Sequence, residues 1–301
     1  MYGWGDDMSN WARPKAYAYA GSSRAKRART QAAKKSKQRG GRSYLDRSSP
    51  DMNLVDPCGK VISTQSTNPV VVAVDVTGSM SHWPYEIFDR LPLLYQTLSQ
   101  YREDVEISFV AIGDATSDRY PLQVCDFSKG IGLEDQLNGL YGEGGGGGTV
   151  RESYELFAHF LLNQCRAPNA QRPFLILYGD EGFYENVSAQ HIRHYLGGQA
   201  SRDVNSLRIW EALSESWNMF HLRKPYGRGH DAEIENQWAE AIGRERIVSL
   251  SGPERAVDLA LGLIARSWGH FDDFTVNMSA RQSAKAVKTL GRRINEIGSD
   301  L

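Results

Sequence analysis

The chain has 301 residues, of which 41% are hydrophobic, so it holds enough apolar side chains for a folded core. Its formal net charge of −1 hides an asymmetry, because residues 1–50 carry twelve Lys and Arg against three Asp and Glu, which leaves 23 against 33 for the rest. This distribution excludes a uniformly basic or acidic protein and predicts a basic arm attached to an acidic folded body.

The cysteines and the apolar runs narrow the class of protein further. Cys58, Cys125 and Cys165 show neither CxxC spacing nor an even count, which argues against a zinc site and against a disulfide framework. The first residues lack the charged-then-apolar layout of a secretion signal, and no apolar run approaches the ~20 residues needed to cross a bilayer. We therefore expect a soluble, cytoplasmic protein that does not contact membranes.

Residues 1–50 form the basic arm. Within it, residues 22–42 hold nine basic side chains and no acidic one, so the arm has little to bury and is expected to be disordered. Two alternatives stay open: the arm orders on a protein partner, or residues 22–42 bind nucleic acid through its phosphates. A polar stretch follows, and we expect residues 51–66 to be a linker.

From residue 67 to residue 266, apolar runs alternate with amphipathic segments. Strands are expected at residues 70–74, 105–112, 122–127, 174–178, 218–222 and 247–250, and helices at 84–98, 133–140, 150–162, 206–216, 231–242 and 253–265. The strand after Pro121 suits an edge, because proline has no N–H to give to a sheet. This alternation predicts a doubly wound α/β fold with a mainly parallel sheet, helices on both faces and one antiparallel edge strand.

The remaining residues, 267–301, are expected to be a C-terminal extension with an amphipathic helix. Val287, Leu290, Ile294 and Ile297 follow one another at spacings of three, four and three, which gives a single apolar stripe on a helix. That stripe either docks on the core or binds a partner.

Three oxygen-bearing side chains directly follow the strand expected at residues 70–74. Asp75, Thr77 and Ser79 alternate in the sequence, and Gly78 between them lets the backbone bend. Open α/β sheets bind their ligands at the carboxyl ends of strands, and hard divalent cations prefer oxygen ligands. The sequence therefore favours a cation site here, although Asp75 could also simply cap the helix that follows.

The segment Asp-Val-Thr-Gly-Ser at residues 75–79 resembles the start of the metal-ion-dependent adhesion site of von Willebrand factor A domains, Asp-x-Ser-x-Ser. In that family a threonine from a second loop and an aspartate after a later strand complete the site. Thr149 follows a glycine run, and Asp180 follows a buried strand in Tyr-Gly-Asp-Glu-Gly, where the family more often has Thr-Asp-Gly. The three segments occur in the family's order, and the resemblance covers residues 67–266.

The resemblance implies a Mg²⁺ or Mn²⁺ site. Ser79, Thr77 and Thr149 would bind the cation directly, and Asp75 and Asp180 would hold coordinating waters. The implied function is a non-enzymatic interaction module in which an Asp or Glu of a partner protein fills the open coordination position. Stand-alone members of this family often resemble adaptors for MoxR-type AAA+ ATPases, so such an ATPase is an expected partner.

An enzyme is the main alternative to a binding module, because the same loops also resemble the A domains of atypical α-kinases. A nucleotide site is not visible in the sequence. The glycine run matches G-x-G-x-x-G trivially and lacks the Lys-Ser/Thr of a phosphate-binding loop. Thr149 to Glu152 also reads as a helix-capping box. Asp114 and Asp118 lack the glycine and glutamate of a calcium loop, so we expect them at the rim of the main site.

Overall fold

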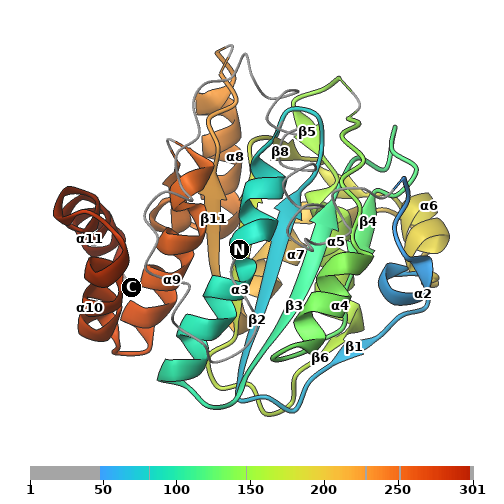
Figure 1. Ribbon diagram of the computed structural model, residues 1–301. Coiled ribbons are helices and arrows are strands. Elements are labelled where there is room, and N and C mark those ends of the chain that lie inside the picture. Colours follow the sequence, from blue (N-terminus) through green and yellow to red (C-terminus); the bar gives the residue numbers. More distant parts are fainter. Residues whose placement is uncertain (1–47, 81, 147, 228, 251, 299–301) are drawn as a thin grey trace.

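The computed structural model describes residues 48–80, 82–146, 148–227, 229–250 and 252–298. Its centre is a six-stranded sheet in the order β12-β11-β7-β2-β3-β4 (Figure 1). These strands are β2 (Asn68–Asp75), β3 (Val105–Ile112), β4 (Leu122–Val124), β7 (Phe174–Gly179), β11 (Asn218–Arg223) and β12 (Ile247–Ser249). Neighbouring strands are parallel except for β4 on β3, which confirms the predicted α/β fold with one antiparallel edge.

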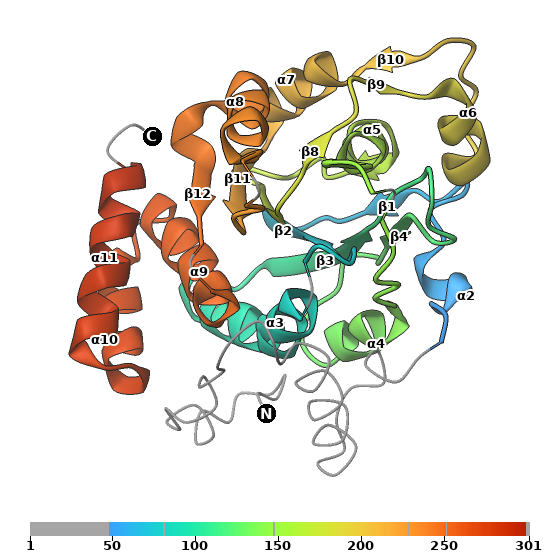
Figure 2. The same ribbon diagram turned by 90° about the horizontal axis from the view of Figure 1, so that it is seen from above.

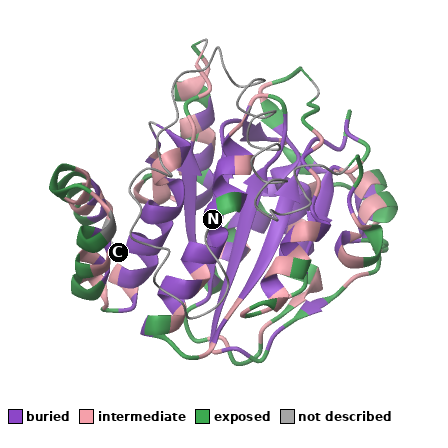
Figure 3. Ribbon diagram, viewed as in Figure 1, coloured by how far each residue is buried: buried purple, intermediate pink, exposed green. Residues whose placement is uncertain are grey.

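Helices cover both faces of this sheet, as Figure 2 shows. One face carries α3 (Trp83–Tyr101), α4 (Gly132–Gly139) and α9 (Ala256–Ser267), and the other carries α5 (Tyr154–Gln164), α7 (Ser206–Ser216) and α8 (Asp231–Ile242). Along β2, Val70, Val72 and Val74 enter the first core, whereas Val71 and Ala73 enter the second. Successive side chains of a strand point to opposite faces, so a strand between two cores is apolar at every position. Figure 3 shows the central strands of the sheet buried, and the edge strand β12 is only partly buried.

The start of α5 differs from the sequence-based prediction of a helix over residues 150–162. Arg151–Glu152 forms the short strand β5, which pairs in parallel with β8 (Gly182–Phe183), so the helix begins only at Tyr154. The residue that precedes the helix is Ser153, and the capping box predicted from Thr149 does not form. Because Arg151 and Glu152 pair with β8, they form a strand and not the first turn of the helix.

Residues 51–66, expected to be a linker, are folded onto the domain. They contain α2 (Met52–Val55) and β1 (Ile62–Ser63), and β1 pairs with β6 (Cys165–Arg166). Val55 and Ile62 are buried in the two cores. Lys60 Nζ donates to the carbonyl oxygens of Leu54 and Val124 at 2.5 and 2.9 Å. Two apolar side chains and one lysine thus anchor an otherwise polar stretch.

The C-terminal segment folds as α10 (Phe271–Arg281) and α11 (Ala284–Gly298), which pack on α9 (Figure 1). Leu290 and Ile294 of the predicted stripe are buried in the same core as the sheet. A Cβ on Gly262 of α9 would lie 2.1 Å from Ile294 Cδ1, so the missing side chain lets the helices approach closely. The segment predicted as an extension therefore shares the core of the domain.

Truncation of Ile294 tests this shared core. We expect Ile294→Ala to lower the free energy of unfolding by about 2 kcal/mol or more, because a fully buried isoleucine leaves a cavity. Val276→Ala on α10 is the control, since Val276 is 70% exposed and its loss should change stability by less than about 0.5 kcal/mol. Urea denaturation measures both variants. If Ile294→Ala were as stable as wild type, the packing of α11 on α9 would not contribute to the stability of the domain.

Short elements complete the described chain. They are β9 (Asn186–Val187), β10 (Val204–Asn205), α6 (Ala189–His191), a π-helical turn at Ile192–Leu196 and 3₁₀ turns at Arg244–Arg246 and Pro253–Arg255. None of the helices in the described ranges is both long and apolar enough to cross a membrane. Residues 1–47 of the basic arm, including its proposed nucleic-acid segment at residues 22–42, lie outside the described residues.

Candidate functional site

Four of the five residues predicted to form the metal site share one chain of hydrogen bonds. Asp75 Oδ1 accepts from the backbone N–H of Thr77 at 2.8 Å and from its hydroxyl at 2.6 Å. The Thr77 and Ser79 hydroxyl oxygens are 3.1 Å apart, and Ser79 Oγ donates to Asp180 Oδ1 at 2.8 Å. Because β2 and β7 are adjacent and parallel, their carboxyl ends bring together residues that lie about a hundred positions apart in sequence.

The glycine run packs tightly against this site. Gly78 N donates to the Gly145 carbonyl at 2.6 Å, and a Cβ on Gly78 would lie 3.1 Å from the carbonyl oxygens of Gly144 and Gly145. On the other side of the run, Asp118 Oδ1 accepts from the N–H of Gly146 at 3.1 Å. The glycines therefore let two loops approach more closely than residues with side chains would allow.

Thr149 does not join the other four predicted residues. Its hydroxyl is exposed, donates to the Arg151 carbonyl at 3.0 Å and lies 3.5 Å from the Tyr184 hydroxyl. Within the described residues, no hydrogen bond links it to Asp75, Thr77, Ser79 or Asp180. The pairing of β5 with β8 directs a different side chain toward the site, that of Glu152.

Glu152 and Glu181 are buried acidic residues that the sequence did not assign to the site. They are 2% and 3% exposed, and the β5–β8 pairing places Glu152 near the loop that carries Glu181. Burial raises the pKa of both groups, and the charge of Asp75 raises that of Glu152 further. Each has a buried Oε2 without a hydrogen-bond donor among the described residues. A buried carboxyl oxygen of this kind is relieved by a proton or by a cation.

Asp75 is held by a hydrogen bond that the sequence did not indicate. The hydroxyl of Tyr154 on α5 donates a short hydrogen bond to Asp75 Oδ2. A Cβ on Gly179 would lie 2.1 Å from that hydroxyl, so the glycine in Tyr-Gly-Asp provides the space for Tyr154. Burial, and then the neighbouring Asp180, raise the pKa of Asp75 to about 8, although hydrogen bonds from Thr77 and Tyr154 oppose the shift.

Lys224 supplies a positive charge at the site. It directly follows β11, and its Nζ lies 2.6 Å from Asp180 Oδ2 and donates to the Ser79 carbonyl at 2.7 Å. The preceding Arg223 pairs with another carboxylate: its Nη2 lies 2.5 Å from Asp231 Oδ1, and its Nη1 donates to the Asp180 carbonyl oxygen at 3.4 Å. One ammonium group thus faces a cluster of four carboxyl groups, those of Asp75, Glu152, Asp180 and Glu181. We call these four residues the acidic cluster.

Asp114 and Asp118, expected at the rim, have structural partners of their own. Asp114 accepts from the backbone and hydroxyl of Thr116 at 3.0 and 2.6 Å, and from the Tyr184 hydroxyl. Asp118 Oδ2 accepts from the N–H of Asp114 at 2.8 Å. Across the described part of the chain, no three His, Cys, Asp or Glu side chains are arranged as a ready-made metal centre. Cation binding here must therefore rely on hydroxyl and water oxygens as well as carboxylates.

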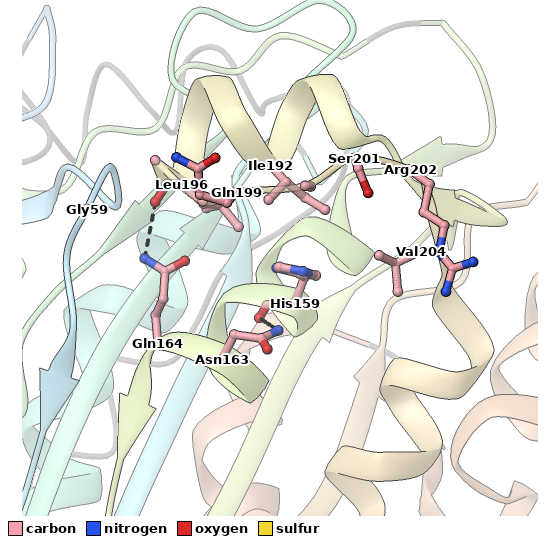
Figure 4. Close-up of a pocket in the computed structure, with 13 residues that line it drawn as sticks. Gly59, His159, Asn163, Gln164, Ile192, Leu196, Gln199, Ser201, Arg202 and Val204 are labelled. Atoms are coloured by element: carbon pink, nitrogen blue, oxygen red, sulfur yellow. Dashed lines mark hydrogen bonds between the residues drawn. The ribbon is translucent and has the colours of Figure 1, made fainter.

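A separate cavity of about 520 Å³ lies between α5 and the segment that follows α6 (Figure 4). His159 and Asn163 of α5 face Ile192 and the Arg202 region across it, and His159 Nδ1 has no hydrogen-bond partner among the described residues. Burial lowers the pKa of His159. The lining includes no member of the acidic cluster, so this cavity and the acidic cluster lie at different places.

Comparisons with known proteins find solved structures that resemble this chain but have little sequence identity to it. The chain matches no family model and no curated protein. Among solved structures it is similar to the pilus adhesin SpaC from Lactobacillus rhamnosus GG, with 11% identity, a TM-score of 0.48, and coverage of 72% of this chain and 32% of that one. It is also similar to proximal thread matrix protein 1 from the mussel byssus, with 11% identity, a TM-score of 0.43, and coverage of 70% and 48%. The chain thus spans less than half the length of either protein.

Proposed function

We propose that the carboxyl ends of β2 and β7 bind a divalent cation and that the protein recognises a partner through it. Ser79 and Thr77 would bind Mg²⁺ or Mn²⁺ through their hydroxyl oxygens, and Asp75 and Asp180 would hold coordinating waters. The observation that carries this proposal is the continuous chain from Asp75 through both hydroxyls to Asp180. All of these donor atoms are oxygens, which suits a hard cation.

The charge of the site also fits a cation. Four buried carboxyl groups lie at this site with one lysine, and carboxylates that ionise in a buried site are normally paired or bound to metals. The donor-less Oε2 atoms of Glu152 and Glu181 point to the same need. We do not include Thr149 among the proposed ligands, because its hydroxyl donates to the Arg151 carbonyl.

Partner recognition would follow from the position of the carboxylates. With Asp75 and Asp180 outside the direct ligands, the cation keeps an open position and enough positive charge to attract an Asp or Glu of a partner protein. The acidic cluster repels a carboxylate that does not reach the cation, so binding requires direct coordination. The AAA+ ATPase partner, the kinase-related alternative and nucleic-acid binding through residues 22–42 stay predictions.

Mn²⁺ alone is sufficient to test the site. Calorimetry on the full chain should find one Mn²⁺ site that Mg²⁺ competes for and that EDTA empties. Ser79→Ala should weaken the affinity by about tenfold or more, because a water must replace the hydroxyl ligand. Ser99→Ala is the control, since Ser99 Oγ bonds to the Gln96 carbonyl within α3. Full affinity in Ser79→Ala would show that the ligand set is wrong.

A further inference from the structure

We propose that Lys224 is a built-in competitor of the divalent cation, which holds the site in the metal-free protein and must withdraw when the cation binds. This inference rests on the function proposed above. Lys224 Nζ contacts the carbonyl oxygen of Ser79 and the carboxylate of Asp180, so it bonds to two of the residues assigned to the cation. Ser79 would use its hydroxyl for the cation and already uses its carbonyl for the ammonium.

The Lys224–Asp180 pair differs from an ordinary surface salt bridge. Asp180 is fully buried and Lys224 is only 19% exposed, so water screens the pair weakly. A surface pair contributes little, but removal of one partner of a buried pair leaves an uncompensated charge. The buried Asp180 therefore needs a positive charge at all times, and either the ammonium or a divalent cation can supply it.

The two positive charges exclude each other. A cation bound to Ser79 Oγ and, through water, to Asp180 would lie within a few ångström of the ammonium, where like charges repel strongly. Lys224 is able to leave because its ammonium is carried on a flexible four-carbon stem and its side chain is partly exposed. Arg223 could not take this role, since its guanidinium is held by Asp231 and is 2% exposed.

Binding of the cation is therefore an exchange, in which the cation replaces the Lys224 ammonium at the site. In metal-free protein Lys224 lowers the cost of burying Asp180, and it lowers the apparent affinity for the cation by the same interaction. Binding of the cation then frees an ammonium group at the edge of the site. This exchange would set the cation concentration at which the site becomes competent for a partner.

Lys224→Met tests the competition directly. Mn²⁺ affinity of the full chain, measured by calorimetry, should rise by about tenfold or more, because a unit of positive charge beside the cation is removed. Lys129→Met is the matched control, since Lys129 is 58% exposed and pairs with Glu106 on the sheet strand β3. Its affinity should stay within about twofold of wild type. Lys224→Arg keeps the charge and should bind Mn²⁺ no more tightly than wild type.

A stability measurement separates competition from a loosened fold. In EDTA, Lys224→Met should melt below wild type, because Asp180 has lost its counter-charge, and Mn²⁺ should raise its melting temperature more than that of wild type. Unchanged or weaker Mn²⁺ binding by Lys224→Met, beside normal binding by wild type, overturns the competition and leaves the proposed function standing. If wild type and Lys224→Met both fail to bind Mn²⁺, the proposed function falls and this inference falls with it.

Discussion

Asp75→Asn is expected to weaken Mn²⁺ binding strongly while making the metal-free protein more stable above pH 8. The amide keeps the size of the side chain, its oxygen can accept from Thr77, and its NH2 group can donate to the Tyr154 hydroxyl, so the fold should survive. It cannot supply the negative charge that orients a coordinating water, and the affinity should fall by about a hundredfold. Stability should rise because an ionised carboxylate no longer has to be buried.

Calorimetry with Mn²⁺ and thermal melts in EDTA at pH 8.5 give the two readouts. Thr149→Ala is the informative comparison. The family resemblance makes Thr149 a direct ligand, but its observed contacts are with Arg151 and Tyr184. We expect this variant to bind Mn²⁺ as wild type does. Normal Mn²⁺ affinity in Asp75→Asn would exclude the site, and a large loss in Thr149→Ala would require the glycine loop to move when the cation binds.

The metal-free protein is expected to lose on the order of 4 kcal/mol of stability between pH 7 and pH 9. Asp75 and Glu155 have pKa values raised to about 8, mainly by burial, and the pKa values of Glu152 and Glu181 are also raised. In the unfolded chain these carboxyl groups are already ionised at pH 7. The folded state therefore holds more protons, and its stability falls as pH rises through the folded-state values.

Urea denaturation in EDTA at several pH values measures how the free energy of unfolding changes with pH. Histidines do not reverse it, because the pKa of His221 is lowered to about 3 and ordinary histidines are mostly neutral above pH 7. A saturating cation should recover much of the loss at pH 9, with about 2.7 kcal/mol expected at a concentration a hundred times its dissociation constant. Stability that is flat or rises over this range would show that the acidic cluster is not strained by its burial.

The fold could be predicted from the sequence because its signals are local. Continuous apolar runs marked β2 and β7 as buried on both faces, and the helical spacing of apolar residues marked the helices that cover them. Asp75, Thr77 and Ser79 could be assigned because they directly follow such a run. Asp180 could be assigned because it follows the second.

The rest of the site depends on contacts without a local signal. Glu152 reaches it through two-residue strands, which are too short to show a period in the sequence. Lys224 contacts Ser79 across 145 positions, and nothing in its own segment marks it. Tyr154 lies in a predicted helix, and nothing in the helical pattern indicates that its hydroxyl reaches Asp75. Such pairs become visible only when the chain is folded.

The carboxyl pair of Glu152 and Glu181 makes the proposed site sensitive to buffer as well as to metal. Without a cation, burial raises the pKa of both groups and so favours a bound proton. A cation beside them removes the need for that proton and favours its release to solvent. Uptake of two positive charges would then be balanced by one departing ammonium and one departing proton. The heat of Mn²⁺ binding would change with the ionisation enthalpy of the buffer, and the interior of the domain would stay nearly constant in charge.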